Sequence, residues 1–173
     1  MVAKDTTLDQ LKQKAKRIKL LLTDSDGVLT DGGVYYSDRG EELKRFNMRD
    51  GMGVARLRSL AGVEVGIVTG EFSASVKKRA EKLSIIEYHP GAKDKFAVLK
   101  EIMDRKNLTA DEIAYIGDDT NDVDVMKRVG LSACPADAMV FAERVADYVC
   151  EAKGGHGAFR EFAEFIIEAK NSD

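Results

Sequence analysis

The chain has 173 residues, 44% of them hydrophobic, and 30 acidic side chains against 27 basic ones give a formal net charge of −3 at pH 7. This near balance of charge, without a basic stripe, argues against nucleic-acid binding, and no apolar run reaches the ~20 residues that a membrane-spanning helix needs. The charged N-terminus lacks the apolar core of a signal peptide, and Cys134 and Cys150 fit buried apolar positions better than a disulfide framework, so we expect a cytoplasmic protein.

The N-terminal part of the chain predicts a helix, a strand and a hairpin, in that order. Thr7 and Gln10 have the spacing of a capping box, and apolar residues recur at helical spacing over 7–17. A short apolar strand follows over 18–23. The turn Ser-Asp-Arg-Gly, in which Gly40 supplies the required dihedral angle, then predicts a β-hairpin. The two strands of this hairpin cover 34–37 and 41–46.

Beyond the hairpin, helices alternate with strands as far as the C-terminus. The expected helices cover 50–60, 73–83, 93–106, 123–129, 139–145 and 157–170. The expected strands cover 63–69, 85–88, 113–117, 131–134 and 148–150. Several strands are apolar on both faces, which is typical of a parallel sheet covered by helices on both sides. We therefore predict an α/β fold, a doubly wound parallel sheet in one domain over 1–173, with residues 33–46 as a small hairpin insertion.

Acidic side chains gather directly after the expected strands, where open parallel sheets bind their ligands. Asp24 and Asp26 follow the first strand, and Asp118 follows the strand that ends in Ile-Gly. Like charges this close would repel and raise each other's pKa unless a cation lay between them. Clustered carboxylate and carbonyl oxygens suit Mg²⁺. Taken singly, Asp119 and Asp122 fit turn or helix-cap positions equally well.

The stretch Thr-Asp-Ser-Asp-Gly-Val-Leu-Thr-Asp-Gly, which contains Asp24, resembles the first motif of the haloacid dehalogenase-like phosphohydrolases. In that superfamily Asp-x-Asp-Gly follows the first strand. Thr69 in Ile-Val-Thr-Gly, Lys95 in Asp-Lys-Phe and Asp118 in Ile-Gly-Asp-Asp-Thr-Asn-Asp stand where its second, third and fourth motifs are expected. Four motifs in the expected order make the resemblance specific, and it covers nearly the whole chain.

A narrower resemblance rests on three longer stretches, DGVLTDGGVYYSDRGEELKRFNMRDGMGV, VGLSACPADA and GGHGAFREF. They resemble the small phosphatases without a cap domain that act on 3-deoxy-ulosonate phosphates. Such enzymes dephosphorylate 3-deoxy-D-manno-octulosonate 8-phosphate (KDO 8-phosphate) or the nine-carbon KDN 9-phosphate and N-acylneuraminate 9-phosphate. The C-terminal third also resembles the phosphatase-like domain appended to vertebrate CMP-sialate synthetases.

The resemblance implies a role for each motif residue. Asp24 would attack phosphorus and carry an aspartyl phosphate, and Asp26 would serve as general acid and then general base. Mg²⁺ would be held by Asp24, by the backbone carbonyl of Asp26 and by Asp118. The remaining roles are phosphate binding by Thr69, Gly70 and Lys95, and orientation of metal-bound water by Asp119 and Asp122.

The residues expected to choose the substrate give a mixed indication. By the same resemblance, arginine usually follows Thr-Gly in KDO 8-phosphate phosphatases, whereas glutamate there, with arginine and lysine on the next helix, goes with KDN 9-phosphate. This chain has Glu71, Arg79 and Lys82, and the two cations would bind the substrate carboxylate, although they also fit an ordinary solvated helix face. Arg49 instead matches the KDO type. We therefore expect a nine-carbon substrate, with KDO 8-phosphate a close second.

A partner subunit is also implied by the resemblance. No cap domain fits into the hairpin or between Thr69 and Lys95, and relatives without a cap form homotetramers in which a neighbour covers the site. The apolar Val-Tyr-Tyr of the hairpin would then form an assembly surface, and the alternative is a monomer with an open site. We expect Met48 and Met52 to fill the core.

Three other functions fit the sequence less well than a phosphatase does. A non-catalytic assembly domain, as in CMP-sialate synthesis, disagrees with the complete set of motif residues, above all Asp24. A signalling receiver domain carries its phosphorylated aspartate after a central strand in mid-chain, not after the first strand. A phosphomutase needs a cap domain to retain its intermediate.

Overall fold

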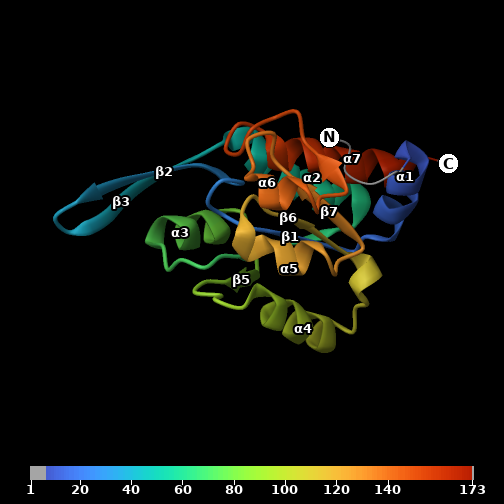
Figure 1. Cartoon of the computed structure of the whole chain (residues 1–173), viewed down its shortest axis with the longest axis horizontal. Helices are drawn as coiled ribbons and strands as arrows, with labels where there is room; N and C mark the ends of the chain where they lie inside the picture. Colours follow the sequence, from blue (N-terminus) through green and yellow to red (C-terminus); the bar gives the residue numbers. More distant parts are fainter. Residues whose placement is uncertain (1–6, 173) are drawn as a thin grey trace.

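A six-stranded parallel sheet forms the centre of the molecule, with helices on both sides of it (Figure 1). The computed structural model describes residues 7–172, so residues 1–6 and 173 of the predicted domain lie outside the described part. The strands run in the order β5-β4-β1-β6-β7-β8, which confirms the predicted α/β fold with a doubly wound sheet. Their bounds are β1 Leu20–Thr23, β4 Glu64–Val68, β5 Glu87–His89, β6 Ile113–Ile116, β7 Leu131–Cys134 and β8 Tyr148–Val149.

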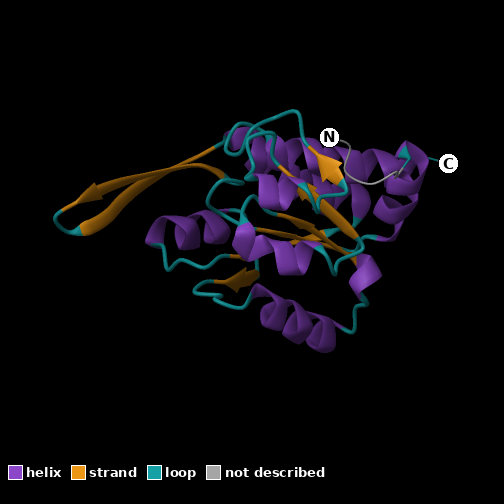
Figure 2. Cartoon of the chain, in the orientation of Figure 1, coloured by secondary structure: helices purple, strands orange, loops and turns teal. Residues whose placement is uncertain are grey.

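Each face of the sheet carries its own buried apolar cluster. One cluster receives side chains from α1, α2, α3 and α7, and the other from α4, α5 and α6. Figure 2 shows helices, in purple, around the strands of the sheet, in orange. Within β1, Leu21 joins the first cluster while Leu20 and Leu22 join the second, because successive side chains of a strand point to opposite faces. The helices are α1 Leu8–Arg17, α2 Met48–Ala61, α3 Ala74–Lys82, α4 Lys95–Lys106, α5 Val123–Met126, α6 Val140–Glu143 and α7 Ala158–Asn171, with short 3₁₀ turns at Ala110–Glu112 and Thr120–Asp122.

The hairpin extends away from the sheet as a separate antiparallel pair, at the left of Figure 1. It consists of β2 Thr30–Ser37 and β3 Gly40–Phe46, so its first strand begins four residues earlier than the sequence predicted. Gly40 has a φ of +106°, which confirms the dihedral angle expected at the turn. Tyr35 and Tyr36 are 66% and 72% exposed, which leaves an apolar surface on this hairpin.

Local predictions of burial were right in some places and wrong in others. The capping box at Thr7 and Gln10 is present at the start of α1. Both cysteines are buried, as expected. Met48 and Met52 are 70% and 55% exposed, so the expectation that they fill the core is wrong, because other side chains of α2 are the ones buried in the first cluster. No helix in residues 7–172 has the length and apolar character needed to cross a membrane.

The strand order defines where a ligand is expected. From β1 the chain proceeds to β4 and β5 on one side, and then returns to β6 on the other side. In open α/β sheets, ligands bind beyond the carboxyl ends of the strands at the point where this order reverses. Here that point lies between β1 and β6, where Thr23 is paired with Ile116. The residues that follow these two strands therefore meet at one edge of the sheet.

Candidate active site

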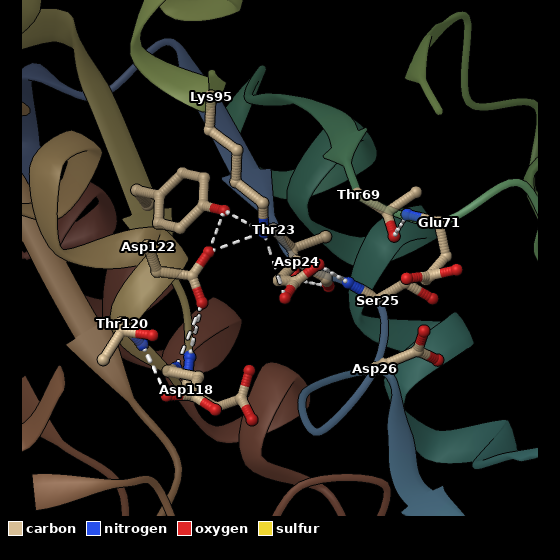
Figure 3. Close-up of polar contacts among 12 residues, drawn as sticks. Thr23, Asp24, Ser25, Asp26, Thr69, Glu71, Lys95, Asp118, Thr120 and Asp122 are labelled. Atoms are coloured by element: carbon tan, nitrogen blue, oxygen red, sulfur yellow. Dashed lines mark hydrogen bonds and ion pairs between the residues drawn. The ribbon is translucent and has the colours of Figure 1, made fainter. Parts of the chain in front are cut away.

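Three aspartates from two strand ends form a carboxylate cluster (Figure 3). One oxygen each of Asp24, Asp118 and Asp122 lies within 4.8 Å of the other two. Asp24 follows β1, and its backbone N–H donates to the carbonyl oxygen of Ile116 in β6 at 3.0 Å. This bond extends the pairing of the two strands by one residue, which brings the first and fourth motifs together as the sequence predicted.

Burial raises the pKa values of two carboxyl groups in this cluster, those of Asp24 and Asp118. It raises the pKa of Asp24 to about 7; the negative charge of Asp122 adds to the shift, and Lys95 opposes it. Burial also raises the pKa of Asp118 to about 8, and the charges of Asp24 and Asp122 contribute further. Carboxyl groups that keep their protons near neutral pH ionise together when a cation binds between them.

The donor set around the cluster fits Mg²⁺. The carboxylate of Asp118 accepts no hydrogen bond from the part of the chain that the structure describes. Gly27 keeps the space beside it open, since an added Cβ there would lie 2.1 Å from Oδ2 of Asp118. Asp24 and Asp118 thus present oxygen ligands of the type that Mg²⁺ prefers. Metal-ligand roles for these residues remain proposals.

Asp122 connects the members of the cluster through hydrogen bonds that both of its oxygens accept. Its Oδ2 accepts the backbone N–H groups of Asp118 and Asp119, at 2.9 and 3.2 Å. Its Oδ1 accepts the hydroxyl of Tyr115 at 2.6 Å and the ammonium of Lys95 at 2.7 Å. With both oxygens engaged in this way, Asp122 orients its protein neighbours, and its expected role in orienting metal-bound water stays a prediction.

Lys95 is a buried cation aimed at the proposed nucleophile. Its side chain is 1% exposed, and its Nζ lies 3.0 Å from Oδ2 of Asp24. Burial by itself would lower the pKa of Lys95, but the negative charges of Asp24 and Asp122 raise it above the usual value. The group is therefore an ammonium ion at neutral pH. Sequence reasoning missed Tyr115, whose only signal was a hydroxyl-bearing side chain within an otherwise apolar strand.

Asp26 lies near Asp24, but its side chain is bound by a residue of the hairpin. Both of its oxygens accept hydrogen bonds from Nζ of Lys44, at 2.8 and 2.7 Å, and Lys44 belongs to β3 of the hairpin. Burial would lower the pKa of Lys44, but its bonds and charge interactions with Asp26 and Glu41 raise it. Sequence reasoning missed this lysine because a charged residue on a hairpin strand normally faces water.

Asp24, Asp26, Asp118 and Lys44 line one pocket of about 490 Å³, whereas Lys95, Asp122 and Tyr115 lie behind its lining. It includes most of the predicted site residues, namely Asp24, Asp26, Thr69, Gly70, Glu71, Asp118 and Asp119. The hairpin adds a wall that the sequence did not predict, made by Val34, Tyr36, Glu41 and Lys44. Thr69 and Gly70 follow β4, the strand beside β1, so three adjacent strand ends contribute to the pocket.

Three residues predicted to bind substrate do not line this pocket in their own protomer. The guanidinium of Arg79 lies 5.6 Å from the centre of the Phe46 ring and donates to the carbonyl oxygen of Asn47 at 2.9 Å. Arg49 and Lys82 are exposed. Within one protomer Arg79 thus joins α3 to the base of the hairpin, and the substrate-binding role of these three residues stays a prediction.

Comparison with known proteins defines the class. The haloacid dehalogenase-like hydrolase family matches residues 68–161. KDO 8-phosphate phosphatase KdsC of Salmonella typhi is 40% identical over 157 residues, which cover 91% of this chain and 83% of that protein. The crystal structure of KDO 8-phosphate phosphatase from Yersinia pestis superposes with a TM-score of 0.91 at 40% identity, over 94% of this chain and 88% of that one. The chain therefore belongs to the haloacid dehalogenase-like hydrolases.

Metal-bound relatives agree with the donor set described above. The phosphatase of Moraxella catarrhalis, solved with a magnesium ion, a phosphate ion and KDO, has a TM-score of 0.92 at 35% identity, with 95% of this chain and 94% of that chain covered. A relative from Haemophilus influenzae, 37% identical with a TM-score of 0.88 and with 91% and 92% of the two chains covered, was solved in a cobalt-bound form. Together with the aspartate cluster, these structures confirm the expected Mg²⁺ cofactor at the level of the family. The protein is a phosphatase, a phosphoric monoester hydrolase, and not a receiver domain.

Proposed function

We propose that this phosphatase removes the phosphate group from a 3-deoxy-2-ulosonate phosphate, with KDO 8-phosphate as the first candidate. The observation that carries the proposal is the single pocket in which Asp24, Asp26 and Asp118 converge. It occurs in a chain 40% identical, over nearly its whole length, to enzymes that act on KDO 8-phosphate.

The geometry supports a two-step reaction through Asp24. Its Oδ1 accepts the backbone N–H of Ser25 at 2.7 Å, and its Oδ2 faces Lys95. A carboxylate oxygen attacks phosphorus while the bond from phosphorus to the sugar oxygen breaks, and Asp26 gives its proton to that oxygen. Asp26 then takes a proton from the water that attacks the aspartyl phosphate, which releases inorganic phosphate and restores Asp24.

The other residues bind charge and exclude water. When bound by Asp24, Asp118 and the Asp26 carbonyl, Mg²⁺ neutralises the phosphate so that an anionic nucleophile can approach it. Thr69, which is 1% exposed, follows β4 beside this position and would bind a phosphate oxygen together with the backbone of Gly70. This division of work is positioning and electrostatics, which dominate phosphoryl transfer.

A nine-carbon substrate, which the sequence favoured, becomes the second candidate, and its support is Glu71. Glu71 lines the pocket, and no arginine is among the described residues that line it. Glu41 on the hairpin wall adds a second carboxylate. Carboxylates accept hydrogen bonds from sugar hydroxyls, so this wall suits a polyhydroxylated chain. By the family resemblance, glutamate at this position goes with KDN 9-phosphate, and the predicted preference for nine carbons rests on it.

We also propose a homotetramer in which a neighbouring subunit completes the site. The exposed apolar side chains of the hairpin, Val34, Tyr35, Tyr36 and Leu43, support an assembly surface there. The position of Arg49, Arg79 and Lys82 outside their own pocket agrees with a role across such an interface. Light scattering on the purified protein tests the assembly, and a monomer would contradict it. The cytoplasmic location stays a prediction.

Substrate choice is tested by Mg²⁺-dependent phosphate release from KDO 8-phosphate, KDN 9-phosphate and N-acetylneuraminate 9-phosphate, with Asp24→Asn as the blank. A preference of tenfold or more in kcat/KM, about 1.4 kcal/mol, identifies the substrate class. A preference for KDO 8-phosphate supports the first candidate, and a preference for the nine-carbon sugars supports Glu71 as the selector. Release from none of them would instead favour a non-catalytic assembly domain.

A further inference from the structure

We propose that Lys44 is a positioning residue for Asp26, through which the hairpin orients the general acid of the active site. None of the four sequence motifs contains Lys44 or any other residue of β3. The inference rests on the proposed function, because Asp26 acts as an acid only if the protein hydrolyses phosphate monoesters as described above.

The contact between Lys44 and Asp26 is short, involves both carboxylate oxygens and is partly buried. Nζ of Lys44 lies 2.8 Å from Oδ1 and 2.7 Å from Oδ2 of Asp26. The Lys44 side chain is 1% exposed and that of Asp26 is 27% exposed. The ammonium group is therefore far less accessible to water than the carboxylate. A contact to both oxygens fixes the direction of the carboxylate, and a buried partner is screened less than a surface ion pair.

Lys44 is itself held by a second residue of the hairpin. Its Nζ lies 3.3 Å from Oε2 of Glu41, three residues earlier in the chain. The other oxygen of Glu41 accepts the hydroxyl of Ser73, and Ser73 is the N-cap residue of α3. A continuous set of polar contacts thus runs from the start of α3, through β3, to Asp26. The hairpin cannot shift relative to α3 without disturbing this set.

The proposed chemistry gives this contact a consequence. Asp26 must deliver a proton to the leaving oxygen while Asp24, two residues earlier, bonds to phosphorus. A proton donor works only within hydrogen-bond reach of its target, and an error of about 1 Å in placement can cost ~10²-fold in rate. The backbone between Asp26 and β2 is a loop, and Thr30 offers Asp26 a hydroxyl only at 3.4 Å. Lys44 supplies the two short contacts that fix the direction of the Asp26 side chain.

The test compares two leaving groups in Lys44→Met, which keeps the apolar stem and removes the charge. A sugar alkoxide is a strong base and needs the proton from Asp26, whereas p-nitrophenolate is a weak base and needs little help. We expect kcat for the sugar phosphate to fall roughly 30-fold or more, because a misplaced acid loses part of the ~10²–10⁴-fold that general acid catalysis contributes, with KM little changed. The kcat for p-nitrophenyl phosphate should fall less than about threefold.

Lys78→Met is the matched control. Lys78 also pairs with a glutamate three residues away in the chain, Glu81, but its side chain is 80% exposed and far less constrained. We expect its kinetics to equal those of the unchanged enzyme. Light scattering on each variant shows whether the assembly is the same, so that a loss of subunits is not mistaken for a misplaced acid.

The kinetic outcomes separate the two proposals. Equal losses on both substrates in Lys44→Met would mean a structural role only, and a raised KM with unchanged kcat would mean substrate binding; either overturns the inference alone. If the enzyme without any substitution had no activity on any phosphate ester, the proposed function would be overturned, and this inference with it.

A second measurement needs no turnover. The thermal midpoints of Lys44→Met, Asp26→Asn and the double variant form a cycle that isolates the coupling between the two side chains. We expect the double variant to depart from additivity by about 2–4 °C, the shift that corresponds to one kcal/mol in a chain of this size. Additive shifts would show that the contact does not hold Asp26, and would reject the inference.

Discussion

Lys95 and Asp122 form an ion pair inside the protein, with Nζ 2.7 Å from Oδ1 and side chains that are 1% and 0% exposed. The same Nζ lies 3.0 Å from Asp24, so Asp122 determines where the cation stands relative to the proposed nucleophile. Removing one member of such a pair leaves the other charge buried and unpaired, which costs far more than an exposed pair contributes. Asp122 therefore acts on the reaction through Lys95.

The first prediction concerns Tyr115, which is fully buried and donates to the oxygen of Asp122 that binds Lys95. In Tyr115→Phe the shape is kept but one donor to a charged acceptor is lost. We expect unfolding in urea to require about 1.5–3 kcal/mol less, the range for a hydrogen bond to a charged group. We also expect kcat to fall about tenfold, because Lys95 is less firmly held.

Tyr35→Phe is the control for this change. Tyr35 lies on the hairpin with 66% of its surface exposed, and the change keeps the apolar ring that the proposed assembly surface uses, so loss of its hydroxyl should leave stability and kcat as they are. If Tyr115→Phe unfolds at the same urea concentration as the unchanged protein, the bond to Asp122 is not a significant source of stability.

The second prediction concerns pH and metal. The folded pKa values of Asp24, about 7, and Asp118, about 8, lie above the ~3.9 of an unfolded aspartate. Between these limits the folded state binds protons that the unfolded chain has released, so this contribution to stability is lost progressively as the pH rises from about 4 and is gone once it has passed about 7 to 8. We expect the thermal midpoint of the metal-free protein to fall by several degrees between about pH 6 and pH 8.5.

Magnesium should reverse this trend, because it binds the ionised carboxylates of the folded state. Thermal melts in a chelator and in excess Mg²⁺ across this pH range measure both effects. In Asp118→Asn the metal-free decline should be smaller, since one of the two titrating groups is gone. Parallel curves for this variant and the unchanged protein would contradict the assignment of the decline to the cluster.

The third prediction concerns the close contact between Gly154 and the loop that carries Asp26. A Cβ on Gly154 would lie 1.8 Å from the carbonyl oxygen of Gly27, and that atom is backbone and cannot rotate away. The backbone N–H of Gly154 also donates to Asp137 at 2.9 Å. We expect Gly154→Ala to cost about 1–3 kcal/mol in stability by overpacking, and to lower kcat by displacing the loop.

Gly33→Ala serves as the comparison, since an added Cβ there meets only the flexible carboxylate of Asp31, at 3.1 Å, and backbone strain is not involved. Chemical denaturation and phosphate release should both be close to those of the unchanged protein. A Gly154→Ala variant that matched Gly33→Ala in both measurements would show that the loop tolerates the displacement.

Much of the fold could be predicted from local sequence because its signals are local. The capping box at Thr7, the turn at Gly40 and the continuously apolar strand before Asp24 each depend on residues within a few positions of one another. Alternation of strands and helices then predicts a parallel sheet, and a parallel sheet brings strand ends to one edge. For this reason Asp24 and Asp118, 94 positions apart in the chain, were predicted to meet.

Only the tertiary structure could identify the partners of these residues, because burial and pairing depend on contacts between distant segments. Lys44 and Tyr115 have the sequence context of a solvated lysine and a core aromatic, yet they bind Asp26 and Asp122. Conversely, Arg79 has the context of a substrate clamp but packs on Phe46 within the protomer. Local motifs in the sequence predict which groups carry the chemistry. The folded chain brings up the neighbours that orient them, because a side chain's charge and direction depend on the atoms that displace water around it.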